Sequence, residues 1–268
     1  MRTTLDETKD DLIAKAADLV AHAKGSGGPP ADHAAEYVRH YYRHVAPEDV
    51  LERTDVDLCG AALSQYHLAL HRPPGRAAVR VFTPTVAEHG WSAGGHTVVE
   101  VVTDDMPFLV DSLTMELNEQ NRNVHVVVHP QLLVRRSLTG ELLEIYTNEE
   151  QQHERLPHDV FRESWMHIEI DRETEPEHLA ALDASLTTIL RDVREAVEDW
   201  DKMCGQVHDI VADLDKNRPP LPEGEVEEGK ALLGWLADDH FTFLGRTTKC
   251  SRASIDSLTR AVYSTESP

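Results

Sequence analysis

The first 75 residues carry apolar positions three and four apart, which is the spacing of one face of a helix. The clearest pattern runs from Leu12 to Ala23 behind an acidic turn, and similar patterns over 32–43 and 56–70 predict two more helices. Gly25 to Pro30 (GSGGPP) predicts a linker, because glycine frees the backbone and the proline pair removes hydrogen-bond donors. We therefore expect residues 1–75 to form a helical N-terminal region.

β-branched residues become frequent after this region, which is typical of strands. A helix is predicted among the strands, beginning at Pro107 because Asp104 and Asp105 suit the turn before a helix N-terminus. The short polar stretch SLTG at 137–140 predicts a hairpin over 132–146. The segments that predict strands are 77–82, 96–102, 124–136, 141–146 and 166–170.

A long helix is predicted from Leu179 to Leu214, where eleven apolar residues alternate spacings of three and four without a miss. At about 1.5 Å per residue such a helix is roughly 55 to 60 Å long, which exceeds what a small sheet can cover. Two interpretations stay open: a coiled-coil seam for self-association, or one helix bent over the sheet and the N-terminal helices. The seam residues that we single out for assembly are Leu186, Ile189, Val193 and Trp200.

The order strand, helix, strand, strand, helix is that of a ferredoxin-like βαββαβ unit, so the predicted fold class is α+β. Residues 76–216 are expected to form this unit together with the long, heptad-patterned helix. Residues 217–230, which contain PPLPEGEVEEG, predict a linker, and 231–245 predict the start of an incomplete second domain. Residues 246–268 hold nine Ser or Thr in 23 positions and predict a disordered tail.

Composition and charge narrow the partners. The chain has 26 Lys and Arg against 48 Asp and Glu, a net charge of −22, which argues against nucleic acid and anionic membranes as partners. No apolar run approaches the roughly eighteen residues of a spanning helix, and the acidic N-terminus does not resemble a signal peptide. We therefore expect a cytoplasmic protein. Its three cysteines include no CxxC pair, so neither a disulfide framework nor a zinc knuckle is predicted.

The sequence lacks the motifs of common catalytic and cofactor sites. None of its 14 glycines has the G-x-G-x-x-G spacing of a dinucleotide site, so no cofactor is predicted in this chain. His40 with His44 on a helix, and His125 with His129 on a strand, have spacings that could hold a metal. No third ligand is placed by the sequence, so we predict no metal site and no catalytic residue.

The segment HTVVEVVTDDMPFLVDSLTMEL resembles the ACT domain, a small amino-acid-sensing module whose first turn reads like D-R-P-G-L-L. Longer strings, including DDMPFLVDSLTMELNEQNRNVHVVVHPQLLVRR, ESWMHIEIDRE and LLGWLADDHFTFLG, resemble the N-terminal region of the large bacterial NAD-specific glutamate dehydrogenases. The likeness runs from about Arg80 to Gly245.

This resemblance implies a non-catalytic regulatory or assembly segment, and the eleven seam positions of the long helix predict that it self-associates. In the parent family, oxidative deamination of glutamate to 2-oxoglutarate with NAD belongs to a distant downstream domain, so the chain is expected to be a fragment or truncated product. The alternative is a free-standing amino-acid-sensing dimer with an ACT-like fold. A third hypothesis, from another class, is a metal-dependent enzyme built on the histidine pairs.

The resemblance also points to a candidate effector site at the first turn of the ACT-like unit. The residues there are Asp105, Pro107, Phe108 and Leu109, and the free amides of a helix N-terminus could bind the carboxylate of an amino acid. However, Phe108 stands where the family has glycine, and Asp104 with Asp105 would repel a carboxylate. The turn is therefore predicted to be either an effector site or a packing interface.

Overall fold

The computed structural model describes residues 4–23, 28–146, 157–241 and 243. The chain divides into two compact units, with unit 1 ending at Val193 and unit 2 starting at Arg194. The boundary falls inside the long helix α7 (Pro176–Lys216), so each unit contains part of this helix.

Unit 1 begins with the predicted helices α1 (Thr4–His22), α2 (Ala31–Tyr41) and α4 (Asp55–Ala69). A short helix, α3 (Pro47–Leu51), was not predicted; it starts at a proline, whose fixed φ suits a first helical position. Residues 1–75 do not form a separate region, because α1, α2 and α4 share one hydrophobic core with the sheet.

All the predicted strands are present, with two changes. The single segment 124–136 is divided into β3 (Val124–Val128) and β4 (Gln131–Arg136), because Pro130 has no backbone N–H to donate within a strand. The last strand, β6 (Val160–Ile170), begins six residues earlier than predicted, since its polar first half pairs with β4. The remaining strands are β1 (Ala78–Phe82), β2 (Thr97–Asp104) and β5 (Leu142–Tyr146).

The predicted hairpin joins β4 to β5 at Gly140. This residue has φ 91°, a conformation that favours glycine, and a Cβ atom there would lie 2.2 Å from the carbonyl oxygen of Arg72. The Gly140 carbonyl accepts hydrogen bonds from the backbone N–H of Arg72 and from the side chain of Arg136, both at 2.9 Å. The hairpin is therefore fixed to the segment that follows α4.

The described strands form one antiparallel sheet of order β1-β2-β6-β4-β5, with β3 paired to the second half of β6. Because β2 and β3 are both antiparallel to β6, they run parallel to each other, and α6 (Leu109–Glu119) connects them. In a βαββαβ unit the strand after the second helix would lie beside β2. Here that place is taken by β1, which precedes β2 in the chain.

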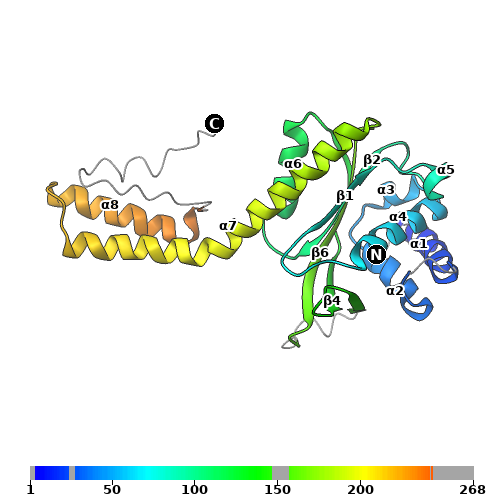
Figure 1. Cartoon of the computed structure of the whole chain (residues 1–268), viewed down its shortest axis with the longest axis horizontal. Coiled ribbons are helices and arrows are strands. Elements are labelled where there is room, and N and C mark those ends of the chain that lie inside the picture. Colours follow the sequence, from blue (N-terminus) through cyan, green and yellow to red (C-terminus); the bar gives the residue numbers. More distant parts are fainter. Residues whose placement is uncertain (1–3, 24–27, 147–156, 242, 244–268) are drawn as a thin grey trace. The chain divides into compact units, whose positions relative to one another are not determined.

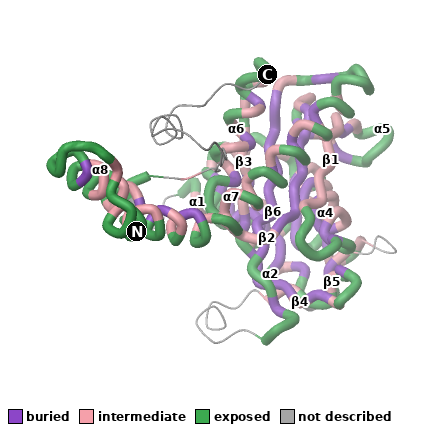
Figure 2. Tube along the Cα trace, turned by 60° about the vertical axis from the view of Figure 1, so that its left-hand side comes forward, coloured by how far each residue is buried: buried purple, intermediate pink, exposed green. Residues whose placement is uncertain are grey.

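Helices cover both faces of the sheet (Figure 1). Helices α1, α2 and α4 cover one face, while α6 and the first part of α7 cover the other. Alternation along β2 divides the two cores: Val99 and Val101 face α6 and α7, and Val102 faces the N-terminal helices. A four-residue helix, α5 (Val86–His89), lies between β1 and β2. Figure 2 shows that β2 and β6 are the most deeply buried strands.

The long helix α7 is confirmed, with 41 residues and a length of about 60 Å. Before its first turn, the carboxylate of Glu173 accepts hydrogen bonds from the backbone N–H groups of Thr174 (2.8 Å) and Glu175 (3.0 Å). Within unit 1 the buried side chains are Leu182, Leu186 and Leu190 rather than the predicted Ile189. A straight helix of 3.6 residues per turn drifts from a strict heptad, which explains this change.

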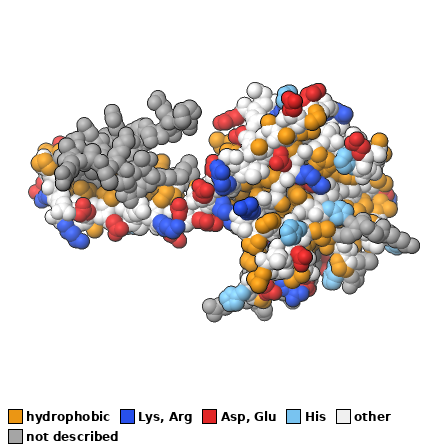
Figure 3. Space-filling model, in the orientation of Figure 1, with side chains coloured by type: hydrophobic (Ala, Val, Ile, Leu, Met, Phe, Trp, Pro, Cys, Tyr) orange, Lys and Arg blue, Asp and Glu red, His pale blue; other side chains and the backbone are white. Residues whose placement is uncertain are grey.

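Unit 2 contains the second part of α7, α8 (Glu223–Trp235) and the π-helical turn η2 (Leu236–His240). Helix α8 runs back beside α7 (Figure 1), and Lys230 of α8 pairs with Asp215 of α7 at 2.6 Å. Charged side chains of both signs line the visible face of this part of α7 (Figure 3). Among the described residues, no helix combines the length and apolar character needed to cross a bilayer.

The predicted linker over 217–230 is too long, because α8 begins at Glu223. Pro222 precedes the helix and acidic residues occupy its first turn, which favours a helix start there although each interior glycine costs about 1 kcal/mol. Of residues 231–245, predicted as the start of a second domain, most belong to α8 and η2, Phe241 has an extended backbone, and 242, 244 and 245 lie outside the described residues. The tail predicted at 246–268 also lies outside them.

Candidate functional site

The predicted effector turn connects β2 to α6. The helix begins at Leu109, two residues later than predicted, because Phe108 turns the chain with a left-handed backbone of φ 69°. Bulky residues adopt this conformation rarely, and it costs about 1 to 2 kcal/mol. Phe108 is 46% exposed, whereas Leu109 is buried in the core between the sheet and α6. Pro107 is exposed and lies before the helix.

Asp105 anchors this turn to two strands. Its backbone N–H donates to the carbonyl of Arg162 on β6 at 2.9 Å. Its Oδ1 accepts hydrogen bonds from the hydroxyl of Ser164 (2.6 Å) and from Nε2 of Gln131 (3.0 Å). One carboxylate oxygen of Asp105 therefore holds the turn against both β6 and β4.

The same contacts determine which ring nitrogen of His129 carries the proton. His129 lies between β3 and β4. Its Nε2 is 3.0 Å from the hydroxyl oxygen of Ser164. Because Ser164 donates its own hydrogen to Asp105, it accepts one from His129, so Nε2 carries the proton. Burial lowers the pKa of His129, although Asp105 opposes this shift. His129 is therefore neutral near pH 7, and its Nδ1 is a hydrogen-bond acceptor. We call Asp105, Ser164, His129 and Gln131 the turn network.

A cleft of about 370 Å³ adjoins the turn network. Tyr41, at the end of α2, is 2% exposed, and its hydroxyl has no hydrogen-bond partner among the residues that the structure describes. His40, one turn away from His44, contacts the carbonyl of Gln131 at 3.1 Å. The cleft is lined by Tyr41, His44, Val45, Val127, His129, Pro130 and Gln131.

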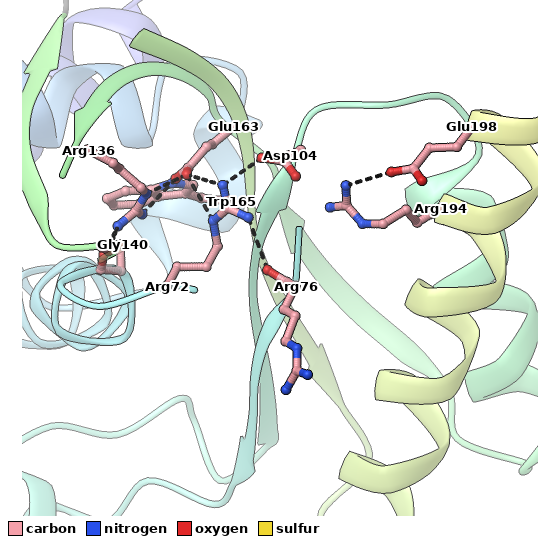
Figure 4. Close-up of polar contacts among 10 residues, drawn as sticks. Arg72, Arg76, Asp104, Arg136, Gly140, Glu163, Trp165, Arg194 and Glu198 are labelled. Carbon is pink, nitrogen blue, oxygen red and sulfur yellow. Dashed lines mark hydrogen bonds and ion pairs between the residues drawn. The ribbon is translucent and has the colours of Figure 1, made fainter. Parts of the chain in front are cut away.

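A second cluster of polar side chains lies inside unit 1 and includes Asp104, the residue before Asp105 (Figure 4). The fully buried carboxylate of Glu163 accepts hydrogen bonds from Arg72 (2.7 and 2.9 Å), from Arg136 (2.6 and 2.8 Å) and from the indole N–H of Trp165 (2.9 Å). Arg72 also donates to Asp104 at 2.6 Å. We call these five residues the arginine–glutamate cluster. Asp104 is thus committed to an ion pair.

A third polar group crosses the sheet beneath the N-terminal helices. Arg80, Glu100 and His167 are direct neighbours on β1, β2 and β6, and Arg80 forms an ion pair with Glu100. Nδ1 of His167 is 4.0 Å from Oε1 of Glu100, too far for a hydrogen bond. Tyr41 and His167 line a cavity of about 30 Å³ in this region, which is enough for a water molecule.

Beside this row, Glu169 interacts with Arg53 and with Nδ1 of His96 (3.0 Å). Burial raises the pKa of Glu169, but the neighbouring His167, His96 and Arg53 outweigh it and lower the pKa to about 2. His96 also stacks on His125 with ring centroids 4.3 Å apart.

In the described residues, the two members of each predicted histidine pair have different partners and do not share a metal site. His125 pairs with Asp171 at 2.8 Å, while His129 belongs to the turn network. His44 lines the cleft and His40 contacts a backbone carbonyl. Within the described part of the chain, no group of three His, Cys, Asp or Glu side chains is arranged to hold a metal ion.

The residues predicted for assembly have different surroundings. Leu186 is fully buried against the sheet of unit 1, and Val193 packs partly against the same core. Ile189 is half-buried on α7. Trp200 belongs to unit 2, where its ring lies 5.8 Å from that of Phe243.

Sequence reasoning missed the arginine–glutamate cluster and the turn network. Within FRESW, Phe161 and Arg162 are exposed whereas Glu163, Ser164 and Trp165 are all buried, so no alternation marked the side of the strand that holds the cluster. The partners could not be read from spacing, because Arg72 and Glu163 are 91 positions apart.

These observations define the class of protein as an α+β domain. Its antiparallel sheet is covered by helices on both faces, and its interior carboxylates are largely committed to ion pairs with arginine.

Comparison with known proteins identifies the family. The model of the glutamate dehydrogenase ACT1 domain matches residues 37–186. The chain is 36% identical over 209 residues to the NAD-specific glutamate dehydrogenase of Pseudomonas aeruginosa, covering 78% of this chain and 12% of that protein. The enzyme of the same name from Halomonas elongata is 38% identical over 218 residues, covering 80% and 13%. That of Mycobacterium tuberculosis is 28% identical over 185 residues, covering 68% and 11%.

The chain belongs to the glutamate dehydrogenase ACT1 domain family. It spans about an eighth of the length of the curated relatives it matches.

Proposed function

We propose that this chain is a non-catalytic regulatory and assembly segment of an NAD-dependent glutamate dehydrogenase. The whole protein would oxidatively deaminate glutamate to 2-oxoglutarate, with NAD bound outside this segment. The observation that carries the proposal is the family match, which covers α2 to the first part of α7 and therefore the whole sheet of unit 1.

The connection of the strands supports an ACT-type unit. Strand β2, helix α6 and strand β3 form a crossover around β6, and α7 follows β6 on the same face as α6. The place beside β2, which the last strand of a βαββαβ unit would take, is filled by β1. Because no strand has to follow α7 back into the sheet, we infer that α7 continues beyond the sheet as a connecting helix.

The use of the buried charges supports a structural role for this interior. Glu163 and Glu100 are fully buried and paired with arginine, whereas a catalytic acid or base must reach a substrate proton. The exposed ring of Phe108 instead supports the packing alternative for the turn. We propose that Asp105, Pro107, Phe108 and Leu109 position a contact surface at the start of α6.

We propose that self-association, if it uses α7, relies on Ile189 and Trp200 rather than on Leu186. Leu186→Asp places a carboxylate in the core and should unfold unit 1, because such burial costs several kcal/mol. Ile189→Asp should preserve the fold and reduce the sedimentation coefficient of an oligomer. Circular dichroism and sedimentation velocity separate these results, and an Ile189→Asp protein with unchanged assembly contradicts this part of the proposal.

The regulatory and assembly role is tested in a whole relative. In the Pseudomonas aeruginosa enzyme, the 209 matching residues are replaced by the corresponding part of this chain or deleted. The proposal predicts that the replaced enzyme assembles like the parent, and that the deleted one still reduces NAD with glutamate but differs in assembly or regulation. Loss of turnover in a deleted enzyme that assembles normally would oppose a non-catalytic role.

A further inference from the structure

We infer that one internal water molecule is bound among Tyr41 of α2, Glu100 of β2 and His167 of β6. This water would accept a hydrogen bond from the Tyr41 hydroxyl and donate to Oε1 of Glu100 and to Nδ1 of His167. It would thereby join the N-terminal helices to two strands of the sheet. The inference rests on three buried polar atoms, on the gap between two of them and on the cavity beside them.

Three polar side-chain atoms in this region are buried and have no hydrogen-bond partner among the residues that the structure describes. They are the Tyr41 hydroxyl, Oε1 of Glu100 and Nδ1 of His167. Tyr41 and His167 are each 2% exposed, and Glu100 is fully buried. Buried polar atoms are almost always hydrogen-bonded, to protein or to ordered water, because an unmade bond costs free energy. These three atoms therefore point to one bound molecule that pairs with all of them.

The three residues lie around a common place between α2 and the sheet. Glu100 and His167 are direct neighbours on β2 and β6, and Oε1 of Glu100 lies 4.0 Å from Nδ1 of His167. Tyr41 and His167 both line the cavity of about 30 Å³. Burial raises the pKa of Tyr41 well above its usual range, and the nearby charges of Glu100 and Glu169 add to this shift. The Tyr41 hydroxyl therefore keeps its proton as a hydrogen-bond donor.

The hydrogen-bond count closes with one water. Nε2 of His167 lies 3.5 Å from Oε1 of Glu169, so we place the ring proton on Nε2, which leaves Nδ1 as an acceptor. Oε1 of Glu100 is a second acceptor, and two acceptors 4.0 Å apart need a donor between them. A water about 2.8 Å from each donates one hydrogen to each, and its oxygen accepts from Tyr41. Three hydrogen bonds are typical of a buried water.

Size and charge favour water over an ion or a larger ligand. The cavity of about 30 Å³ exceeds the ~10–15 Å³ that one water needs and is about a tenth of a small-molecule site. Glu100 pairs with Arg80, and Glu169 pairs with Arg53. Because both carboxylates are already balanced by guanidinium groups, the site gains little from a cation. An anion would be repelled by the two carboxylates.

A crystal structure of the complete chain, at a resolution that shows ordered waters, tests the site directly. We expect one density peak within about 3.2 Å of the Tyr41 hydroxyl, of Oε1 of Glu100 and of Nδ1 of His167. Crystals grown in sodium chloride and in rubidium chloride should show the same peak, without anomalous signal from rubidium. A direct hydrogen bond from Tyr41 to Glu100, a site without a peak, or a rubidium signal there overturns the inference.

Two matched variants test the bond in solution by urea unfolding. Tyr42→Phe is the control, because the buried Tyr42 hydroxyl donates directly to the carbonyl of Leu58 at 2.8 Å. With the water in place, Tyr41→Phe also removes one hydrogen bond, so both variants should lower the urea midpoint by about 0.3 M. If the Tyr41 hydroxyl has no partner, its removal leaves the midpoint unchanged or raises it. A Tyr41→Phe midpoint at or above that of wild type therefore overturns the inference.

The ring nitrogens of His167 give an independent readout. In the chain labelled with ¹⁵N in histidine, NMR should find the proton of His167 on Nε2 and a hydrogen-bonded Nδ1 that carries none. A proton on Nδ1 overturns the arrangement.

This inference goes beyond the proposed function and does not depend on it. All three measurements are made on the chain itself, without glutamate, NAD or turnover. Their failure therefore leaves the regulatory proposal in place, and a failed replacement in the relative leaves the water site in place.

Discussion

Glu163→Gln should be one of the most destabilising conservative changes in unit 1. The arginine–glutamate cluster contains two guanidinium groups and two carboxylates, so its formal charges cancel. Removing the charge of Glu163 leaves +1 in a region where this residue is fully buried and Arg72 is 2% exposed. The new amide would also direct N–H groups toward arginine donors. Breaking a buried pair in this way costs about 3 to 5 kcal/mol.

Urea unfolding measures this cost. With an m-value near 3 kcal/mol/M for a domain of this size, the midpoint should fall by about 1 M or more. Trp165 lies in the cluster, with its indole N–H 2.9 Å from Glu163, and is one of the four tryptophans whose fluorescence follows unfolding. Glu144→Gln is the matched control. Its partner Arg135 lies 3.2 Å away and both side chains are more than 40% exposed, so the loss should stay below about 1 kcal/mol. A Glu163→Gln protein within about 1 kcal/mol of wild type would refute the reasoning.

Three other changes test the packing, the turn and the acid response. Gly60→Ala should destabilise the protein by about 1 to 3 kcal/mol, because a Cβ atom would lie 2.2 Å from Cγ of Trp91. Gly205→Ala adds a Cβ atom in open space and should stabilise α7 by about 0.5 to 1 kcal/mol. Thermal unfolding compares the two variants. Phe108→Gly should not destabilise and should gain up to about 1 kcal/mol from relief of its left-handed backbone, so a clear loss in urea unfolding opposes the account. The folded pKa of Glu169, about 2, lies below its unfolded value of 4.5, so its contribution is present above about pH 5 and is lost as the pH falls toward 2. Glu169→Gln should flatten this acid decline, and equal slopes contradict the assignment.

The sequence predicted the elements of unit 1 well where one period dominates. The run TVVEVV in β2 and the leucines of α6 have local patterns that survive in the fold. The first part of α7 was predicted as a helix, but the seam continues through Leu190, because a straight helix departs from a strict heptad. The N-terminal helices were predicted without their partner, since an amphipathic face does not specify what covers it.

The candidate site was less accessible to prediction, because its contacts join distant segments. Asp105 was singled out for its place in the turn, yet its role depends on Ser164, 59 positions away. Phe108 was identified as standing at a glycine position, but its left-handed backbone runs against the preference of a bulky residue and was not predicted. The cleft beside His129 lies where β3 and β4 separate at Pro130.

Our central proposal is that this segment is a non-catalytic part of an NAD-dependent glutamate dehydrogenase. The most direct test is to measure glutamate-dependent reduction of NAD by the isolated chain and by the Pseudomonas aeruginosa enzyme in which the chain replaces the matching residues. The account predicts no NADH from the isolated chain and turnover within about threefold of the parent from the replaced enzyme. Glutamate-dependent NADH formation by the isolated chain, or an assembled replaced enzyme without turnover, would contradict it.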